Sequence, residues 1–170
     1  SLNWGGSLIR PEATGYGNVY FAAEMLATQE KSFENKKCLV SGSGNVAQFT
    51  TEKVLQLGGR VLTLSDSSGY IYDEEGIDEQ KLAFVKELKN IRRGRIKEYT
   101  EKYPQATYTD ADLSLDYNPL WNHKADCALP SATENEINEQ DAQNLIDNGI
   151  TLVSEGSNMP STPDAVRLFV

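Results

Sequence analysis

The sequence predicts an α/β fold with a doubly wound, largely parallel sheet. Short apolar runs alternate with longer amphipathic stretches along the 170 residues. The intervening stretches are long enough for helices, and strands joined by helical crossovers lie parallel, with both faces of the sheet covered. A glycine-rich segment follows the first apolar run and is typical of the strand-to-helix turn in such folds. We expect one domain over residues 1–170, because this length suits a single hydrophobic core.

The first helix is predicted over residues 14–30, with Thr14 as its N-cap after Pro11 and Glu12. Its apolar side chains recur at helical spacing: Val19, Phe21, Ala22, Met25 and Leu26. The compact apolar run at residues 38–40 then predicts a buried strand, because a parallel strand covered on both faces needs no polar alternation.

The second helix ends at Gly58 and Gly59. The side chains predicted to share one of its faces are Val46, Phe49, Val54 and Leu57. Residues 61–64 predict the next strand, and residues 66–69 predict a turn into a short hairpin arm at residues 70–72.

The second half of the chain continues the alternation. Residues 78–102 are helical in composition, with a break near Gly94. Residues 127–129 and 151–153 predict two more strands, with a helix over about residues 138–147 between them. A last helix is expected to begin at Ser161, Thr162 and Pro163.

Composition excludes several classes of protein. The 25 acidic residues exceed the 16 Lys and Arg, giving a net charge of −9, so we expect no nucleic-acid partner. The chain has neither a long apolar run nor a signal-peptide pattern, so we expect a cytoplasmic protein with no membrane partner. Two cysteines and one histidine supply neither a disulfide framework nor a His-based zinc site, so no metal is expected.

The most informative segment is Ser41-Gly42-Ser43-Gly44-Asn45-Val46-Ala47, which has the pattern G-x-G-x-x-A between a predicted strand and a predicted helix. Gly42 allows a sharp turn, and Gly44 lets a pyrophosphate approach the backbone amides at the helix N-terminus. Ala47 is small enough for close packing of the helix on the sheet. The strand–turn–helix context favours a Rossmann-like dinucleotide site over a glycine turn without a ligand.

The end of the second strand carries the residues that choose between dinucleotides. Asp66 lies about 20 residues after the glycine loop, where a carboxylate accepts from the adenosine ribose and favours NAD. Ser67 and Ser68 are hydroxyl donors suited to phosphate oxygens, which favours NADP instead.

A basic segment adds to the case for a phosphate. Residues 86–102 contain seven Lys and Arg against three Glu, in a chain that is acidic as a whole. Lys89 and Arg92 are three residues apart, so on a helix they share a face and could clamp one anion. A solvated helix face explains the same charges, and charge alone leaves the two interpretations open.

Five motifs, in order along nearly the whole chain, strongly resemble the hexameric glutamate dehydrogenases. They are Arg10-Pro11-Glu12-Ala13-Thr14-Gly15-Tyr16-Gly17, Ser41-Gly42-Ser43-Gly44-Asn45-Val46-Ala47-Gln48, Ser65-Asp66-Ser67-Ser68-Gly69, Ala128-Leu129-Pro130-Ser131-Ala132-Thr133 and Glu155-Gly156-Ser157-Asn158-Met159-Pro160.

The resemblance implies a role for individual residues. It places Arg10 near the substrate carboxylate, and Thr14 on the nicotinamide carboxamide. Asn158 is implied near the nicotinamide ribose and the substrate. The pyrophosphate is implied to contact Ser43, Asn45 and Val46, and the ribose to contact Ser131 and Ala132. Without the family, each has a structural explanation, such as a helix cap for Thr14 or a surface ion pair for Arg10.

The Ser-Asp-Ser-Ser-Gly turn resembles the NADP-preferring branch of the family. That resemblance implies that Ser67, Lys89 and Arg92 hold the 2′-phosphate, so NADP is the expected cofactor, with NAD as the alternative. Asp66 is then expected to be protonated or turned toward a ribose hydroxyl, because its charge would oppose the phosphate. One departure from the family is Glu134, where a glutamine is common, and its charge is expected to weaken dinucleotide binding modestly.

The resemblance also implies what the whole protein does. It would interconvert 2-oxoglutarate plus ammonia with glutamate, using NADP(H), as a homohexamer. The catalytic residues are expected on a substrate domain outside this chain, so the chain is expected to be an excised cofactor-binding domain that is inactive alone. A branched-chain or aromatic amino-acid dehydrogenase remains an alternative, as does a non-catalytic nucleotide-sensing module. Convergence of Arg10, Thr14 and Asn158 at one end of the groove would favour a dehydrogenase over the sensing module.

Overall fold

A computed structural model describes residues 11–133, 136–154 and 166–168, the first four and the last three of these as backbone only. The helices and strands are α1 (Pro11–Ala27), β1 (Lys37–Val40), α2 (Asn45–Gln56), β2 (Arg60–Val61), β3 (Thr63–Asp66), β4 (Gly69–Tyr72), α3 (Glu79–Lys86), the π-helical η2 (Glu87–Ile91), the 3-10 turn η3 (Ile96–Glu98), α4 (Tyr99–Lys102), β5 (Thr107–Asp110), the 3-10 turn η4 (Pro119–Trp121), β6 (Cys127–Leu129), α5 (Glu139–Asp147), β7 (Leu152–Ser154) and β8 (Val166–Leu168). Within the described part of the chain, no helix has both the length and the apolar character needed to span a bilayer.

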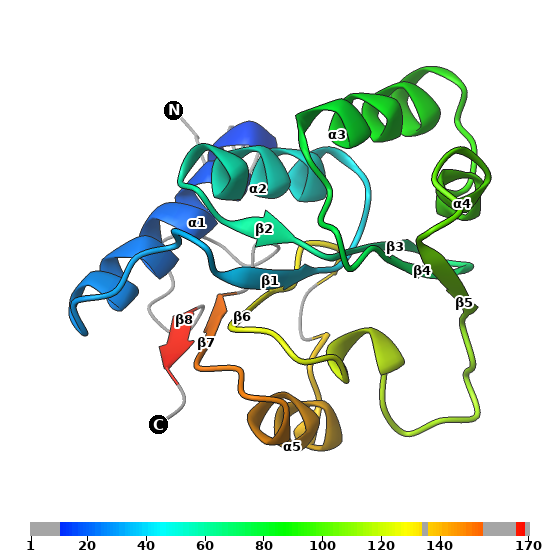
Figure 1. Cartoon of the computed structure of the whole chain (residues 1–170). Helices are drawn as coiled ribbons and strands as arrows, with labels where there is room; N and C mark the ends of the chain where they lie inside the picture. Colours follow the sequence, from blue (N-terminus) through cyan, green and yellow to red (C-terminus); the bar gives the residue numbers. More distant parts are fainter. Residues whose placement is uncertain (1–10, 134–135, 155–165, 169–170) are drawn as a thin grey trace, which may run out of the picture.

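The main sheet has the order β2-β1-β6-β7-β8, and its first four strands are parallel (Figure 1). This confirms the predicted α/β class with a largely parallel sheet. The chain order reverses between β1 and β6, so the carboxyl ends of these two strands form the crevice where α/β sheets bind ligands.

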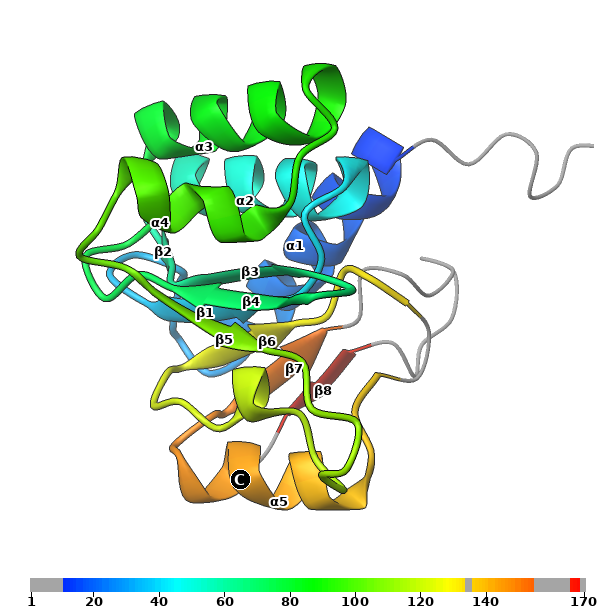
Figure 2. The same ribbon diagram turned by 90° about the vertical axis from the view of Figure 1, so that its right-hand side faces the viewer.

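Helices cover both faces of the main sheet. Figure 2 shows α2 and α3 on one side and α5 on the other. Successive strand residues point into two separate cores: Cys38 and Val40 pack beneath α1, α2 and α3, whereas Leu39 packs with Leu145 of α5 and with Trp121. Continuous apolar runs are therefore explained by burial on both faces.

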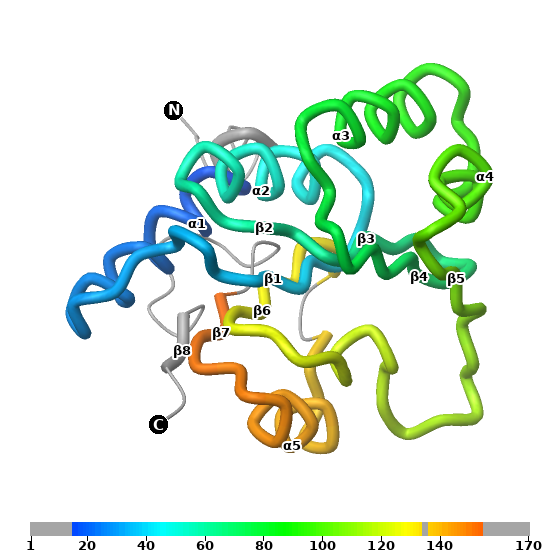
Figure 3. The backbone as a smooth tube through the Cα atoms, in the orientation of Figure 1, coloured from blue at the N-terminus to red at the C-terminus, as the bar shows by residue number. Residues whose placement is uncertain are grey.

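The predicted strand at residues 61–64 is wrong in one respect, because it divides into two. β2 pairs in parallel with β1, whereas β3 leaves the main sheet and forms a second, antiparallel sheet with β4 and β5 (Figure 3). Where β3 leaves, the Thr63 hydroxyl accepts from the Val40 amide and donates to its carbonyl, both at 2.9 Å. A side chain thus satisfies backbone groups that would otherwise be buried without partners.

Two predictions for the first helix are corrected. The helix α1 begins at Pro11, so Thr14 lies inside it and is not the N-cap; proline is suited to a first helical turn because its missing amide has no partner to lose there. Val19, Ala22 and Leu26 are fully buried, but Phe21 is 41% exposed, because two residues after Val19 a helical side chain points away from the core.

The face predicted for the second helix is also displaced. The buried residues of α2 are Ala47, Gln48, Thr50, Thr51 and Val54. Of the four residues predicted from the sequence, only Val54 is fully buried; Val46, Phe49 and Leu57 are half-buried. The reason is that α1 packs along α2, with Gly15 so close that a Cβ there would lie 2.9 Å from the Phe49 Cβ. The helix α2 therefore buries one face on the sheet and part of another on α1.

The last predicted helix is wrong for residues 166–168. These residues form β8, antiparallel to β7, with Ser154 opposite Val166. A short helix gains little without a partner surface, whereas the edge of β7 offers backbone hydrogen bonds to a strand. The other predicted strands and helices, including the break near Gly94, are confirmed.

Candidate functional site

The glycine loop turns from β1 into α2 at the point where the sheet order reverses. Gly42 has φ +85°, a left-handed conformation that favours glycine, and a Cβ there would lie 3.0 Å from the Ser131 carbonyl oxygen. Gly44 faces open space, since a Cβ on it would meet no atom within 4 Å in the described structure. The first glycine is required by the fold, and the second leaves room for a ligand.

The amino end of α2 is suited to binding an anion. Within the described residues, no side chain caps this end and no acidic residue lies in its first turn. The free amides and the helix dipole give it a partial positive charge. Asn45 is exposed and Val46 half-buried beside this end, and the Ser43 carbonyl accepts from the side-chain amide of Gln48 at 2.9 Å. A phosphate group is the natural ligand for such a helix end.

The second loop of the crevice follows β6 and is bound to the first. The Ser131 amide donates to the Ser41 hydroxyl at 3.0 Å. The Ser131 side chain is buried, and its hydroxyl lies 3.0 Å from the Leu129 carbonyl and 3.2 Å from the Thr50 hydroxyl. In this arrangement Ser131 holds the two loops together, and its contact with a ribose stays a prediction.

Glu136, which the sequence did not single out as a site residue, lies beside this loop. Its carboxylate accepts from the Ser41 hydroxyl at 2.7 Å and from the Ala132 and Thr133 amides at 3.0 and 3.1 Å. Ala132 itself is exposed at the crevice. The backbone amides after β6 thus already hold a carboxylate, and the interpretation of Ala132 as a ribose contact stays a prediction.

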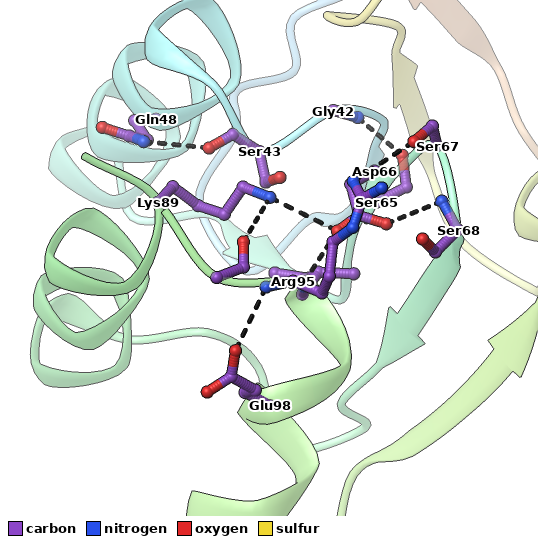
Figure 4. A network of polar contacts seen from close by, with 12 residues as sticks. Gly42, Ser43, Gln48, Ser65, Asp66, Ser67, Ser68, Lys89, Arg95 and Glu98 are labelled. Carbon is purple, nitrogen blue, oxygen red and sulfur yellow. Dashed lines mark hydrogen bonds and ion pairs between the residues drawn. The ribbon is translucent and has the colours of Figure 1, made fainter. Parts of the chain in front are cut away.

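Asp66, at the end of β3, is bound by the protein itself. Its Oδ2 accepts from the Ile96 amide at 2.8 Å and from Lys89 Nζ at 3.3 Å, and its Oδ1 accepts from the Ser68 amide at 2.9 Å (Figure 4). Burial raises the pKa of the carboxyl, but the Ile96 and Ser68 amides and the Lys89 charge outweigh burial, so the net pKa lies below its ordinary value.

The expectation that Asp66 is protonated or turned toward a ribose hydroxyl is not met, because both carboxylate oxygens accept hydrogen bonds from the protein and these bonds lower the pKa of the carboxyl. Its side chain is only 7% exposed, and its charge is offset by Lys89. Asp66 fixes the Ser67–Ser68 turn, the start of η3 and the Lys89 ammonium. Because Lys89 offsets the charge of Asp66, that charge opposes a nearby phosphate less.

The arginine beside Ser67 is Arg95, and not Arg92 as predicted from the sequence. The Arg95 guanidinium donates to the Ser67 hydroxyl at 3.2 Å, whereas Arg92 is paired with Glu98 at 2.7 Å. The predicted clamp of Lys89 and Arg92 assumed α-helical spacing, but the helix ends in the π-helical η2 and the chain reverses at Arg93, with φ +53°. Arg92 does not line a hollow with Lys89, whereas Arg95, which the sequence did not single out, does.

Lys89 and Arg95 border an open hollow of about 690 Å³ beside the amino end of α2. The hollow is lined by Asn45, Lys89, Asn90, Arg93, Gly94 and Arg95. The side chains of Gln48 and Asn90 exchange two hydrogen bonds, at 3.0 and 3.1 Å, which link α2 to η2. The hollow joins a helix amino end to three cations, so it suits a ligand that carries more than one phosphate.

The side chains of three residues whose roles rest on the resemblance lie outside the described structure. Arg10 and Asn158 lie outside the described residues, and Thr14 is described by its backbone alone, in the first turns of α1. Their convergence at one end of the crevice stays a prediction.

The chain is similar to known dehydrogenases. The model of the Glutamate/Leucine/Phenylalanine/Valine dehydrogenase family matches residues 5–170. An NAD(P)-specific glutamate dehydrogenase of Xylanibacter ruminicola is 60% identical over 168 residues, covering 99% of this chain and 36% of that protein. An NADP-specific glutamate dehydrogenase of Helicobacter pylori is 52% identical over 170 residues, with 99% and 37% covered.

A solved structure has a fold similar to that of this chain. Glutamate dehydrogenase 2 of Plasmodium falciparum superposes with a TM-score of 0.80 at 47% identity, covering 97% of this chain and 35% of that one. The chain thus spans about a third of the length of the curated relatives it matches.

Proposed function

This chain belongs to the Glutamate/Leucine/Phenylalanine/Valine dehydrogenase family, and from that premise we propose that it is the dinucleotide-binding domain of a glutamate dehydrogenase that uses NADP. The observation that carries the proposal is the hollow beside the amino end of α2, where Lys89, Arg93 and Arg95 line one cavity in a chain of net charge −9. Such a concentration of positive charge in an acidic chain favours a phosphorylated ligand.

The pyrophosphate of the dinucleotide binds at the glycine loop. The uncapped amides of α2 donate to it, and the open space above Gly44 admits it to the backbone. Ser43, Asn45 and Val46 line this position. The donor set suits the group, since it combines a helix amino end with a residue that has no side chain.

The 2′-phosphate binds at the Ser67 turn. Lys89 and Arg95 supply the charge, and the Ser67 hydroxyl supplies a further hydrogen bond. Asp66 positions these groups from beneath, because it accepts from Lys89 and from the amides that shape the turn and η3. A 2′-phosphate is what distinguishes NADP from NAD, so this arrangement supports NADP as the preferred cofactor and leaves NAD as the weaker one.

The full-length protein interconverts 2-oxoglutarate plus ammonia with glutamate, with the bound dinucleotide supplying or accepting the hydride. This chain contributes binding and orientation, which lower the barrier by holding the reactants in place. Thr14, Asn158 and Arg10 are proposed at the nicotinamide end, and acid–base chemistry lies outside this chain. The names of the similar proteins support glutamate over branched-chain or aromatic substrates. We place the protein in the cytoplasm as a homohexamer.

A calorimetric titration of the chain with NADP⁺ and with NAD⁺, each at two salt concentrations, tests the cofactor proposal. We expect tighter binding of NADP⁺ and a preference that weakens as salt rises, because part of it comes from partly exposed charges. A preference for NAD⁺ would contradict the assignment of the 2′-phosphate to Ser67, Lys89 and Arg95.

A further inference from the structure

Arg93 has an unusual backbone for a residue with a side chain. Its φ is +53°, in the left-handed region that glycine occupies without steric cost and other residues occupy rarely. The next residue is Gly94, so the sequence has a glycine close by yet places the arginine at the strained position. Backbone strain of this kind is commonly kept at functional sites.

The reversed chain at Arg93 decides which cations face the hollow. After η2, the Gly94 amide donates to the Leu88 carbonyl at 2.8 Å, and the Gly94 carbonyl accepts from Lys89 at 3.0 Å. This compact turn places Arg93 and Arg95 on the wall of the hollow, while Arg92 is paired with Glu98.

Arg93 differs in its partners from three nearby cations, Lys89, Arg92 and Arg95. Lys89 is paired with Asp66, Arg92 with Glu98, and Arg95 is bonded to Ser67. The exposed Arg93 makes no ion pair or hydrogen bond with any described residue. In a chain with 25 acidic residues, a cation on the wall of a hollow and without a carboxylate is available to an anion from solution.

We propose that Arg93 is a specificity-determining residue, whose guanidinium adds to Lys89 and Arg95 in holding the 2′-phosphate of NADP. This rests on the proposed function, because the ligand in the hollow is taken from it. A planar guanidinium can bind two phosphate oxygens at once, and the left-handed backbone presents it next to Arg95 on the same wall. Arg93 thus raises the discrimination against NAD without contacting the rest of the cofactor.

The test is a titration of wild-type chain and three variants with NADP⁺ and NAD⁺ at low and high salt. Arg93→Gly removes the charge and keeps the left-handed backbone at no steric cost. Arg93→Lys keeps the charge, and Arg92→Gln is the matched control, because it removes a cation that is already paired. A thermal melt of each variant checks that the fold is kept.

We expect Arg93→Gly to weaken NADP⁺ binding about three- to tenfold at low salt and less at high salt, with NAD⁺ binding unchanged and thermal stability equal or higher. Arg93→Lys keeps most of the affinity, and Arg92→Gln keeps all of it. NADP⁺ binding unchanged in Arg93→Gly, or a loss shared equally by NAD⁺, would overturn the role of Arg93. A wild-type chain with no preference for NADP⁺ would overturn the cofactor proposal and this inference together.

Discussion

Two aspartates at the antiparallel hairpin, Asp66 and Asp73, each pair with a lysine from the helical segment that follows, but in different surroundings. Asp73, just after β4, is fully buried, and its Oδ2 accepts from Lys81 at 2.9 Å and from the Tyr99 hydroxyl at 2.5 Å. Asp66 meets Lys89 at 3.3 Å at the edge of a hollow that Arg93 and Arg95 also line.

The difference shows that an aspartate–lysine pair alone does not indicate a ligand site. Around Asp73, Lys81 and Tyr99 donate to acceptors of the protein itself. The cluster joins β4 to α3 and α4. Around Asp66, the carboxylate is likewise fully bonded, but it lies beside Lys89, whose side chain is 16% exposed, and the exposed Ser67 and Arg95. The first pair therefore stabilises the fold, whereas the second supports the residues that we propose to bind the phosphate.

The largest effect is expected from Asp73→Asn. Lys81 is only 11% exposed and would lose the charge that compensates its ammonium, so the free energy of unfolding should fall by about 3 kcal/mol. Denaturant unfolding at neutral pH measures this loss. Glu75→Gln is the control, because Glu75 lies 3.7 Å from the same lysine but is 68% exposed, and it should cost about 0.5 kcal/mol or less. Equal losses of unfolding free energy in Asp73→Asn and Glu75→Gln would contradict the difference expected between a buried and an exposed partner of Lys81.

A smaller loss of stability, about 1–2 kcal/mol, is expected from Asp66→Asn, because hydrogen bonds to the Ile96 and Ser68 amides and to Lys89 weaken. Since the pKa of Asp66 is lowered in the folded state, its contribution is present above the ordinary pKa near 3.9 and is lost as pH falls through the folded value. The stability difference between wild type and variant should therefore shrink on acidification below about pH 4. A difference that stays constant down to pH 2.5 would contradict the ionised Asp66 described here.

The third comparison concerns binding and separates Arg95 from Arg92. We expect Arg95→Gln to weaken NADP⁺ binding about tenfold, because it removes a charge-assisted contact beside Ser67. Arg92→Gln should change it by less than about twofold, because its guanidinium is engaged by Glu98. Fluorescence titration of both variants measures the ratio, and a larger loss in Arg92→Gln would restore the clamp predicted from helical spacing.

The sequence predicts the main sheet well because its signals are local. The apolar runs at Cys38, Cys127 and Leu152 are buried on both faces, and each became a strand of the parallel sheet. The departure of β3 could not be predicted in this way, because it depends on the Thr63 hydroxyl meeting the Val40 peptide across two strands. Such a contact exists only once the fold has formed.

The site was predictable in part for the same reason. The glycine loop, Asp66 and Lys89 follow from motif and spacing. Asp66 binds Lys89, and Lys89 lines the hollow beside the amino end of α2. The position of Arg95 could not be predicted from α-helical spacing. The helix ends in a π-helical segment and Arg93 has a left-handed backbone, and both interrupt the α-helical period. Glu136 was missed because its contact with the distant Ser41 joins two loops that only the fold brings together.

The central claim, that cations of the hollow hold a 2′-phosphate, is tested most directly by phosphorus NMR of NADP⁺ bound to this chain across a pH series. A free phosphate monoester has its second pKa near 6, and nearby cations favour the dianion. We predict that binding lowers the pKa of the 2′-phosphate and that Arg95→Gln returns it part of the way. A 2′-phosphate that titrates in the complex as it does in free NADP⁺ would contradict the claim.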